Sequence, residues 1–189
     1  MDSASKRGID IIDLHREKAT KSEFEGRIKK TDPSLVILNG HGDDDCVTGH
    51  DNKVLVKTGD NEALLKNRIT YAISCNSAKK LGPSCIDEKT AYIGYKKSFI
   101  FNIDRRYLSR PLQDKRAERF LNASNQVALS LIKGHSAAEA TQRSQAQFKN
   151  TIRSLLTSTN TDPESLDDMK DLLWDMRQQV CLGANDAKI

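Results

Sequence analysis

The sequence has little of what marks several large classes of protein. It has only four cysteines and one tryptophan in 189 residues, and aromatic residues make up 5% of the chain. Four cysteines are too few for a disulfide-stapled scaffold, so the composition predicts free thiols in a reducing compartment, with a cytoplasmic location. No apolar run approaches the roughly 20 residues that cross a bilayer, and residues 1–8 are polar rather than signal-like.

The chain also lacks a strong excess of charge. Its 30 basic and 26 acidic residues leave a formal net charge of +4, which is too small to predict nucleic-acid binding. Neither nucleic acid nor a membrane is therefore expected as a partner. The length suits one compact domain with a hydrophobic core.

Short apolar runs alternate with helical stretches, which predicts an α/β domain with a mainly parallel sheet. The run at residues 35–38 does not alternate, so we expect a strand covered on both faces. Strands are predicted at residues 9–14, 35–38, 54–56, 69–73 and 91–95, with an extension or edge strand at 99–103. Helices are predicted at residues 20–30, 61–67, 113–133, from Ser136 onward and at 165–180, with a loop at 157–163.

Glu139 lies three residues after Ser136, in the capping-box position. The spacing of strands and helices divides the chain into an α/β core at residues 1–110 and C-terminal helices at residues 111–189. We expect these helices to pack on the same domain rather than to form a second one.

Two predicted strands end in residues that carry chemistry. His41 follows the strand at residues 35–38, and Cys75 follows the strand at residues 69–73. Side chains just beyond the carboxyl ends of adjacent parallel strands share one crevice, so we expect these two to meet. A thiol beside an imidazole forms a nucleophilic thiolate, and residues 76–80 are predicted to open a helix that favours it. The N–H groups of Gly42 and Cys75 are candidate donors to an oxyanion.

A hydrophobic strand ending in His41-Gly42, a glycine-bearing loop at residues 47–49, and a strand ending in Ser74-Cys75 resemble the caspase-fold cysteine peptidases. This superfamily includes caspases, metacaspases, gingipains, separase and CHAT-domain proteases, and the resemblance covers residues 9–103. It implies a three-layer fold and a cysteine endopeptidase acting on a protein or peptide substrate through an acyl-enzyme. It assigns His41 as general base and acid, Cys75 as nucleophile and Gly42 to the oxyanion hole. It implies no cofactor, although calcium activates some relatives.

The residues before the nucleophile differ from those of the best-known relatives. Caspases carry Gln-Ala there and metacaspases carry Asp two positions before the cysteine, whereas this chain has Ile73-Ser74. Strict specificity for Asp is therefore not expected. Our hypothesis for substrate binding uses Ser74 together with the acidic run that follows the histidine, Asp43, Asp44 and Asp45, which would attract a basic side chain.

The front of the chain is short for the fold that it resembles. Such sheets begin with a strand and helix ahead of the one predicted at residues 9–14, and only eight residues precede it here. We therefore expect the first strand to be missing, which would leave one edge of the sheet exposed. Either a protein partner covers this edge, or the true start of the protein lies upstream.

Two other interpretations use the same residues. His41, Cys46 and His50, with Cys75 or Cys85, have tolerable spacing for a zinc site, although the chain has no CxxC pair and we expect no metal. The other is a catalytically inactive member of the fold that serves as a binding or scaffold module.

Overall fold

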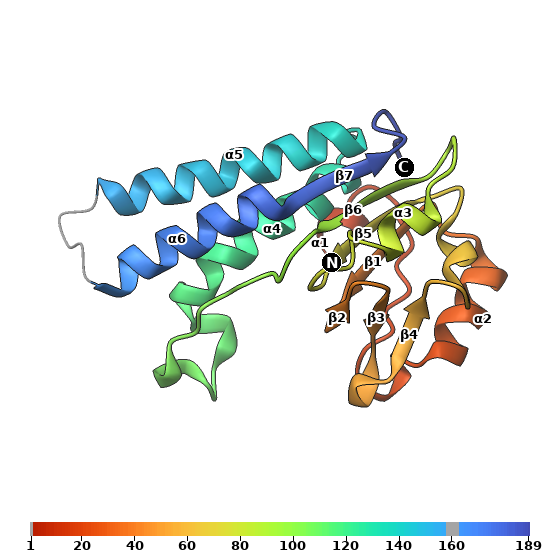
Figure 1. Cartoon of the computed structure of the whole chain (residues 1–189), viewed down its shortest axis with the longest axis horizontal. Helices are drawn as coiled ribbons and strands as arrows, with labels where there is room; N and C mark the ends of the chain where they lie inside the picture. The colour runs from red at the N-terminus through yellow and green to blue at the C-terminus, as the bar shows by residue number, and fades with distance from the viewer. Residues whose placement is uncertain (1, 158–162) are drawn as a thin grey trace.

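The computed structural model describes residues 2–157 and 163–189, and it has helices on both faces of a central sheet (Figure 1). The helices are α1 (Asp2–Ser5), α2 (Lys21–Thr31), α3 (Leu81–Cys85), α4 (Lys115–Ile132), α5 (Ala137–Leu156) and α6 (Pro163–Gln178). The strands are β1 (Leu35–Asn39), β2 (Gly42–Asp43), β3 (Cys46–Thr48), β4 (Val54–Lys57), β5 (Ile69–Ile73), β6 (Ala91–Tyr95) and β7 (Gln179–Gly183). Short 3-10 turns are η1 (Arg16–Lys18), η2 (His50–Asn52), η3 (Glu62–Leu65), η4 (Arg105–Tyr107) and η5 (Pro111–Gln113).

The central sheet is mainly parallel, as the sequence predicts. Its strand order is β1-β5-β6-β7; β1, β5 and β6 run parallel, and β7 pairs antiparallel with β6. The register of the first pair places Asn39 opposite Ile73, so the two strands end level with each other. A separate three-stranded antiparallel sheet, β2-β3-β4, follows directly from the end of β1.

Each face of the central sheet has its own apolar core, which makes the domain three-layered. One face packs against α2, α3 and the small sheet, with Phe24, Leu38, Val56 and Leu81 among the buried side chains. The other face packs against α4 and α5, through Tyr71 and Ile93 from the sheet. Because β5 and β6 are covered on both sides, all of their residues are buried.

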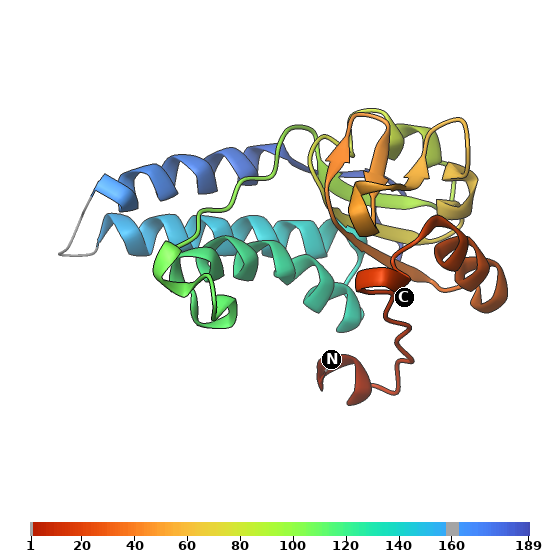
Figure 2. The ribbon, with the colours of Figure 1, turned by 90° about the horizontal axis from the view of Figure 1, so that it is seen from below.

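The helices α4, α5 and α6 lie side by side and extend well beyond the sheet (Figure 2). The predicted capping box at the start of α5 is confirmed: Ser136 accepts from the Glu139 N–H, and Glu139 accepts from the Ser136 N–H. Asp114 caps α4 by a one-way bond, its side chain accepting from the N–H groups of Arg116 and Ala117. None of the helices within residues 2–157 and 163–189 is long and apolar enough to cross a membrane.

The strand predicted at residues 9–14 is wrong. This segment is an extended coil with no strand partner, and its Ile11 and Ile12 side chains are 47% and 49% exposed. A short β-branched run becomes a strand only when another strand accepts its backbone groups. In the described part of the chain no strand pairs with the outer side of β1, which is therefore an edge of the sheet.

The edge position also corrects the prediction for residues 35–38. Burial along β1 alternates, and Ile37 is 45% exposed, so this strand is covered on one face only. An apolar run indicates a strand but does not say whether a helix covers its second face.

Three further predictions differ from the structure in their length or type. Residues 61–67 contain only the short turn η3, residues 99–103 form no strand, and residues 75–80 form turns before α3 begins at Leu81. The helix predicted at residues 165–180 ends at Gln178 and continues directly as β7, which the sequence analysis missed. Most of the loop predicted at residues 157–163 lies outside the described residues.

Candidate active site at the ends of β1 and β5

The segment after β1 passes directly beside the segment after β5. The Gly40 N–H donates to the Ile73 carbonyl at 3.4 Å, which extends the parallel pairing beyond the last residue of β1. Continuing this register by two residues brings His41 level with Cys75. The tertiary structure therefore places these two residues at one edge of the sheet, where parallel α/β sheets bind their ligands.

Gly42 makes the closest approach between the two segments. A Cβ atom at this position would lie 2.1 Å from the Ser74 Oγ and 2.7 Å from the Cys75 carbonyl oxygen. Any side chain would thus push the His41-Gly42 segment away from Cys75. Gly40 is similarly constrained, because a Cβ there would lie 2.4 Å from the Thr48 carbonyl oxygen.

The hairpin formed by β2 and β3 fixes the direction of the Gly42 N–H. Thr48 donates its N–H to the His41 carbonyl at 2.8 Å, and Gly42 is paired with Val47 one step further along the ladder. Hydrogen-bonded and non-bonded pairs alternate along antiparallel strands. Gly42 therefore belongs to a non-bonded pair, and its N–H points away from β3; within residues 2–157 and 163–189 no acceptor is found for it.

The acidic turn of this hairpin holds the loop that carries Cys75. The Asp44 carbonyl accepts from the N–H groups of Lys80 and Leu81 at 2.9 and 3.0 Å, while its carboxylate lies 2.7 Å from the Lys79 ammonium. The hydrogen bond from Lys79 lowers the pKa of the Asp44 carboxyl below its usual value. Asp44 thus anchors the loop of residues 75–80 to β2 and β3, a role that the sequence analysis missed.

The other two aspartates of the turn also have partners within the chain. Asp45 lies 3.6 Å from the Lys57 ammonium, and Asp43 accepts from the Asp44 N–H at 2.7 Å. The hypothesis that Asp43, Asp44 and Asp45 attract a basic substrate side chain stays a prediction, and two of the three carboxylates already neutralise lysines of this protein.

Cys75 is half-buried in a loop held by backbone hydrogen bonds rather than at a helix N-terminus. Its thiol donates to the Phe99 carbonyl at 3.8 Å, and the following residue, Asn76, has a positive φ of 57° and donates its N–H to Lys97. Ala78 donates to Tyr95 in the same way. The helix predicted to activate the thiol is absent from this position, so its dipole does not act on Cys75.

Ser74 is buried with a hydroxyl that has no hydrogen-bond partner in the structure. Its hydroxyl lies close to Gly42, where a Cβ atom would be 2.1 Å from the Ser74 Oγ. Its role as a substrate-binding residue stays a prediction.

Beyond Cys75 runs an extended segment that we call the strap, residues 97–102. Helix α6 holds one of its edges: Trp174 donates its indole N–H to the Ser98 carbonyl, and the Ile100 N–H donates to Asp175, both at 2.9 Å. The opposite edge faces the Cys75 loop, through the carbonyl groups of Lys97 and Phe99. Within the described residues, the N–H groups of Phe99 and Phe101 have no partner.

The anchor of the strap is an unusual carboxyl group. Asp175 is buried, one of its oxygens has no hydrogen-bond partner, and burial raises its pKa to about 8. The bond from the Ile100 N–H opposes this shift, and the neighbouring Asp171 adds to it. Burial therefore favours the neutral form of Asp175 in the folded protein, in which it accepts from the strap without the cost of a buried charge.

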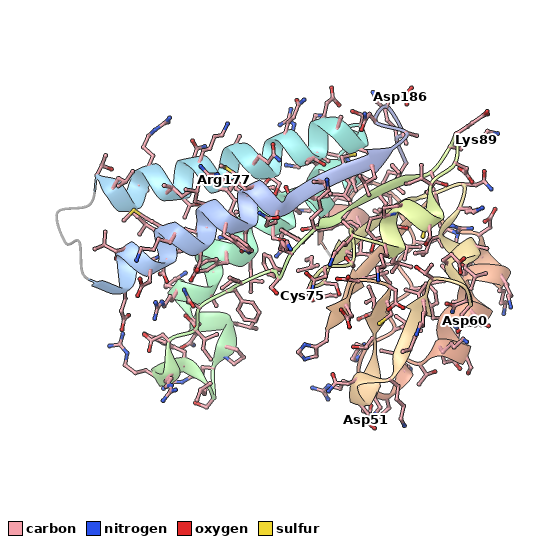
Figure 3. All side chains as sticks on the ribbon, viewed as in Figure 1. Asp51, Asp60, Cys75, Lys89, Arg177 and Asp186 are labelled. Atoms are coloured by element: carbon pink, nitrogen blue, oxygen red, sulfur yellow. The ribbon has the colours of Figure 1, made fainter. Side chains whose placement is uncertain are left out.

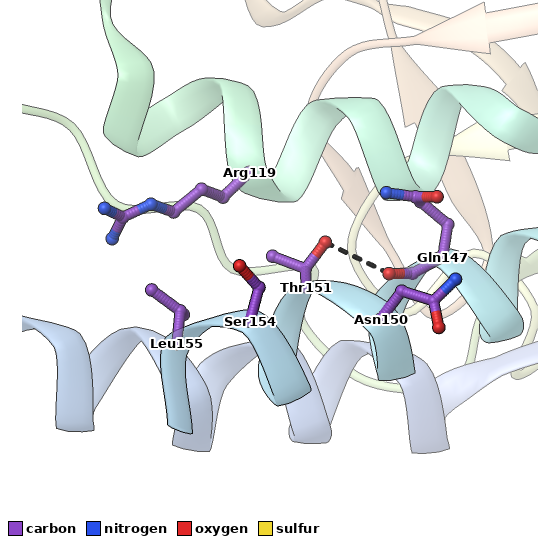
Figure 4. A pocket seen from close by; sticks show the side chains of 6 residues that line it. All are labelled: Arg119, Gln147, Asn150, Thr151, Ser154 and Leu155. Atoms are coloured by element: carbon purple, nitrogen blue, oxygen red, sulfur yellow. Dashed lines mark hydrogen bonds between the residues drawn. The ribbon is translucent and has the colours of Figure 1, made fainter. Parts of the chain in front are cut away.

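Other features do not contribute to this site. A shallow groove of about 390 Å³ lies between α4 and α5 and is lined mainly by polar side chains (Figure 4). All of its lining residues belong to these two helices, and Cys75 is not among them. The labelled position of Cys75 is instead at the junction of the strap with the sheet (Figure 3). In residues 2–157 and 163–189, no three His, Cys, Asp or Glu side chains are grouped to hold a metal ion, so the zinc alternative has no ligand set.

Comparison of the chain with protein-family models, with curated proteins and with solved structures found no match in any of the three.

Proposed function

We propose that this protein is a cysteine endopeptidase of the caspase-fold type, with Cys75 as nucleophile and His41 as general base and acid. The observation that carries the proposal is the close approach of Gly42, the residue after His41, to Ser74 and Cys75 at the ends of two adjacent parallel strands. Two residues with complementary chemistry, 34 positions apart, follow the ends of adjacent parallel strands, at the edge where such sheets hold their active sites.

The reaction begins when His41 takes the thiol proton of Cys75 and the thiolate sulfur attacks the carbonyl carbon of a peptide bond. The tetrahedral oxyanion accepts hydrogen bonds from the N–H groups of Gly42 and Cys75. The imidazolium of His41 then protonates the leaving amine, the C–N bond breaks and a thioester remains. Water, deprotonated by His41, attacks the thioester and releases the carboxylic acid and the thiol.

The strap offers a place for the peptide. An extended chain laid along the strap beyond the Asn76–Lys97 hydrogen bond would pair with the unpartnered N–H groups of Phe99 and Phe101, as one strand pairs with another. Such pairing uses backbone groups alone, so it suits an endopeptidase that binds an extended segment of a longer chain.

The alternative is an inactive binding or scaffold module, and one observation favours it. The Cys75 thiol donates to the Phe99 carbonyl, so in this structure its hydrogen bond is to the strap and not to His41. In the peptidase, substrate pairing with the strap has to replace this bond and return the thiol to His41.

Labelling with a thiol-directed peptide electrophile tests the proposal. The native chain should be labelled at Cys75, Cys75→Ala should not be labelled, and His41→Ala should react at least about tenfold more slowly. Cys46→Ala is the matched control, because Cys46 is also half-buried and lies in the adjacent hairpin. Equal labelling of the native chain and Cys75→Ala would refute the nucleophile assignment, and full labelling without turnover of any peptide would favour the inactive module.

A further inference from the structure

The segment from the end of the strap to the start of α4 carries several exposed apolar side chains, and we call residues 101–113 the arm; its first two residues are the last two of the strap. It projects from the end of the helical layer, in green at the lower left of Figure 1. Leu112 is 100% exposed and Leu108 is 67% exposed, and Phe101 and Ile103 are close to half exposed. Single exposed leucines are common, but four large apolar side chains exposed within thirteen residues are a concentration typical of a binding surface.

The arm is a built structure rather than a loose loop. Asp104 accepts from the Arg106 N–H at 3.0 Å, and its own N–H donates to the Asp114 carboxylate that caps α4, at 2.8 Å. At its base, the Asn102 amide donates to both Asp168 and Asp171 on α6. The arm that contains the short turns η4 and η5 is thus bonded to α6 and to the N-cap of α4. These bonds hold the backbone in a conformation that leaves Leu108 and Leu112 exposed.

The polar side chains of the arm are mainly cationic. It contains three arginines and one aspartate, and that aspartate, Asp104, is paired with Arg106. Among the described residues, no carboxylate lies within ion-pair distance of Arg105 or Arg110. Two guanidinium groups without a carboxylate partner therefore lie on either side of Leu108 in the sequence, and Arg110 is separated from Leu112 only by Pro111.

The protruding leucines and the cationic side chains of the arm together indicate the kind of partner that it would bind. A protruding leucine gains little from a flat protein surface, but it enters the boundary between the headgroups and acyl chains of a bilayer without needing a complementary pocket. Free arginines beside it contact phosphate groups, which they bind through bidentate hydrogen bonds. Basic residues close to an anionic leaflet add to the attraction of the apolar side chains.

We propose that the arm docks this protein peripherally on an anionic phospholipid surface. Leu108 and Leu112 enter the interfacial region of the bilayer, and Arg105 and Arg110 bind lipid phosphates. Nothing crosses the membrane in this arrangement, and the docking does not depend on peptidase activity. Because the arm continues directly into the strap, the docked protein would hold the Cys75 site at a fixed orientation to the lipid surface.

Vesicle flotation with the full chain tests the docking. The protein should float with vesicles of phosphatidylcholine and phosphatidylserine but not with phosphatidylcholine alone, and added salt should weaken the binding. Leu108→Ala combined with Leu112→Ala should weaken it about tenfold or more, since each leucine inserts apolar surface. Leu156→Ala combined with Leu166→Ala is the matched control, because both are exposed leucines outside the arm and their loss should have no effect.

A second pair of variants separates the charge from the apolar surface. Arg105→Gln combined with Arg110→Gln should reduce both the affinity for phosphatidylserine vesicles and its dependence on salt, while circular dichroism remains that of the native fold. Absence of vesicle binding at low salt, equal binding to uncharged vesicles, or equal loss in the arm and control variants would overturn the proposal. Self-association that depends on Leu108 and Leu112 without vesicle binding would overturn it in favour of a second copy of the chain.

Discussion

Asp175 links the buried core to the strap, and its replacement by asparagine has a calculable effect on stability. Its pKa is about 8 in the folded protein against an ordinary value of 3.8. Between these values the folded chain keeps a proton that the unfolded chain has lost. The free energy of unfolding therefore falls as pH rises through this window, by about 1.4 kcal/mol per pH unit, and levels off above the folded pKa.

Asp175→Asn removes this dependence while it preserves the acceptor for the Ile100 N–H. Between about pH 5.5 and 7.5, the native chain should lose roughly 3 kcal/mol of stability relative to the variant, which is two units at the slope given above. Urea unfolding followed by circular dichroism across this range measures the difference. Trp174 fluorescence gives a second readout beside the strap, because its indole is bonded to Ser98.

Asp167→Asn is the matched control, since Asp167 is an exposed aspartate on the same helix. Its stability should change with pH as that of the native chain does. Parallel stability profiles for the native chain and Asp175→Asn would refute the reasoning, because a carboxyl that is already ionised at neutral pH cannot produce the difference. The strap would then have to be held by a charged acceptor.

Two further predictions follow from close contacts. Gly42→Ala places a Cβ 2.7 Å from the Cys75 carbonyl oxygen, so it should abolish labelling of Cys75. The control Gly26→Ala, at a helical position with open space around it, should leave labelling intact and the free energy of unfolding unchanged or up to about 1 kcal/mol higher. Normal labelling of Gly42→Ala would contradict the close approach of Gly42 to Cys75. Asp168→Ala removes a buried carboxylate that binds Arg116 at 2.8 Å and Arg119 at 2.9 Å, so thermal unfolding should show a loss of about 3 kcal/mol, and a loss below about 1 kcal/mol would show that these arginines find other partners.

Local signals in the sequence predicted the elements that depend on local interactions. The capping box of Ser136 and Glu139 lies within four residues, and the structure confirms it. The continuous apolar runs at β5 and β6 are typical of central parallel strands, and both strands are buried on both faces. The mainly parallel α/β sheet followed from the alternation of such runs with helical stretches.

Elements that depend on distant partners were missed or mistaken. β7 is a strand because Leu182 pairs with Tyr92, 90 positions earlier, and its short polar-flanked run resembles the end of a helix. The strap has no periodic pattern, and its conformation is set by two hydrogen bonds to α6: Trp174 donates to the Ser98 carbonyl, and Asp175 accepts from the Ile100 N–H. For residues 9–14 the error is the reverse, a predicted strand that is absent: the pattern is typical of a strand, but within the described residues no other strand pairs with it.

The candidate site divides along the same line. The sequence by itself determined the chemistry, a histidine and a cysteine each at the end of an apolar run, together with the glycine that follows the histidine. Only the tertiary structure decided that β1 and β5 are neighbours in register, that Asp44 holds the Cys75 loop, and that the strap lies beside the thiol. The reason is physical: residue type and periodicity act over a few positions, whereas strand order and loop anchoring come from hydrogen bonds and packing between segments that are tens of residues apart.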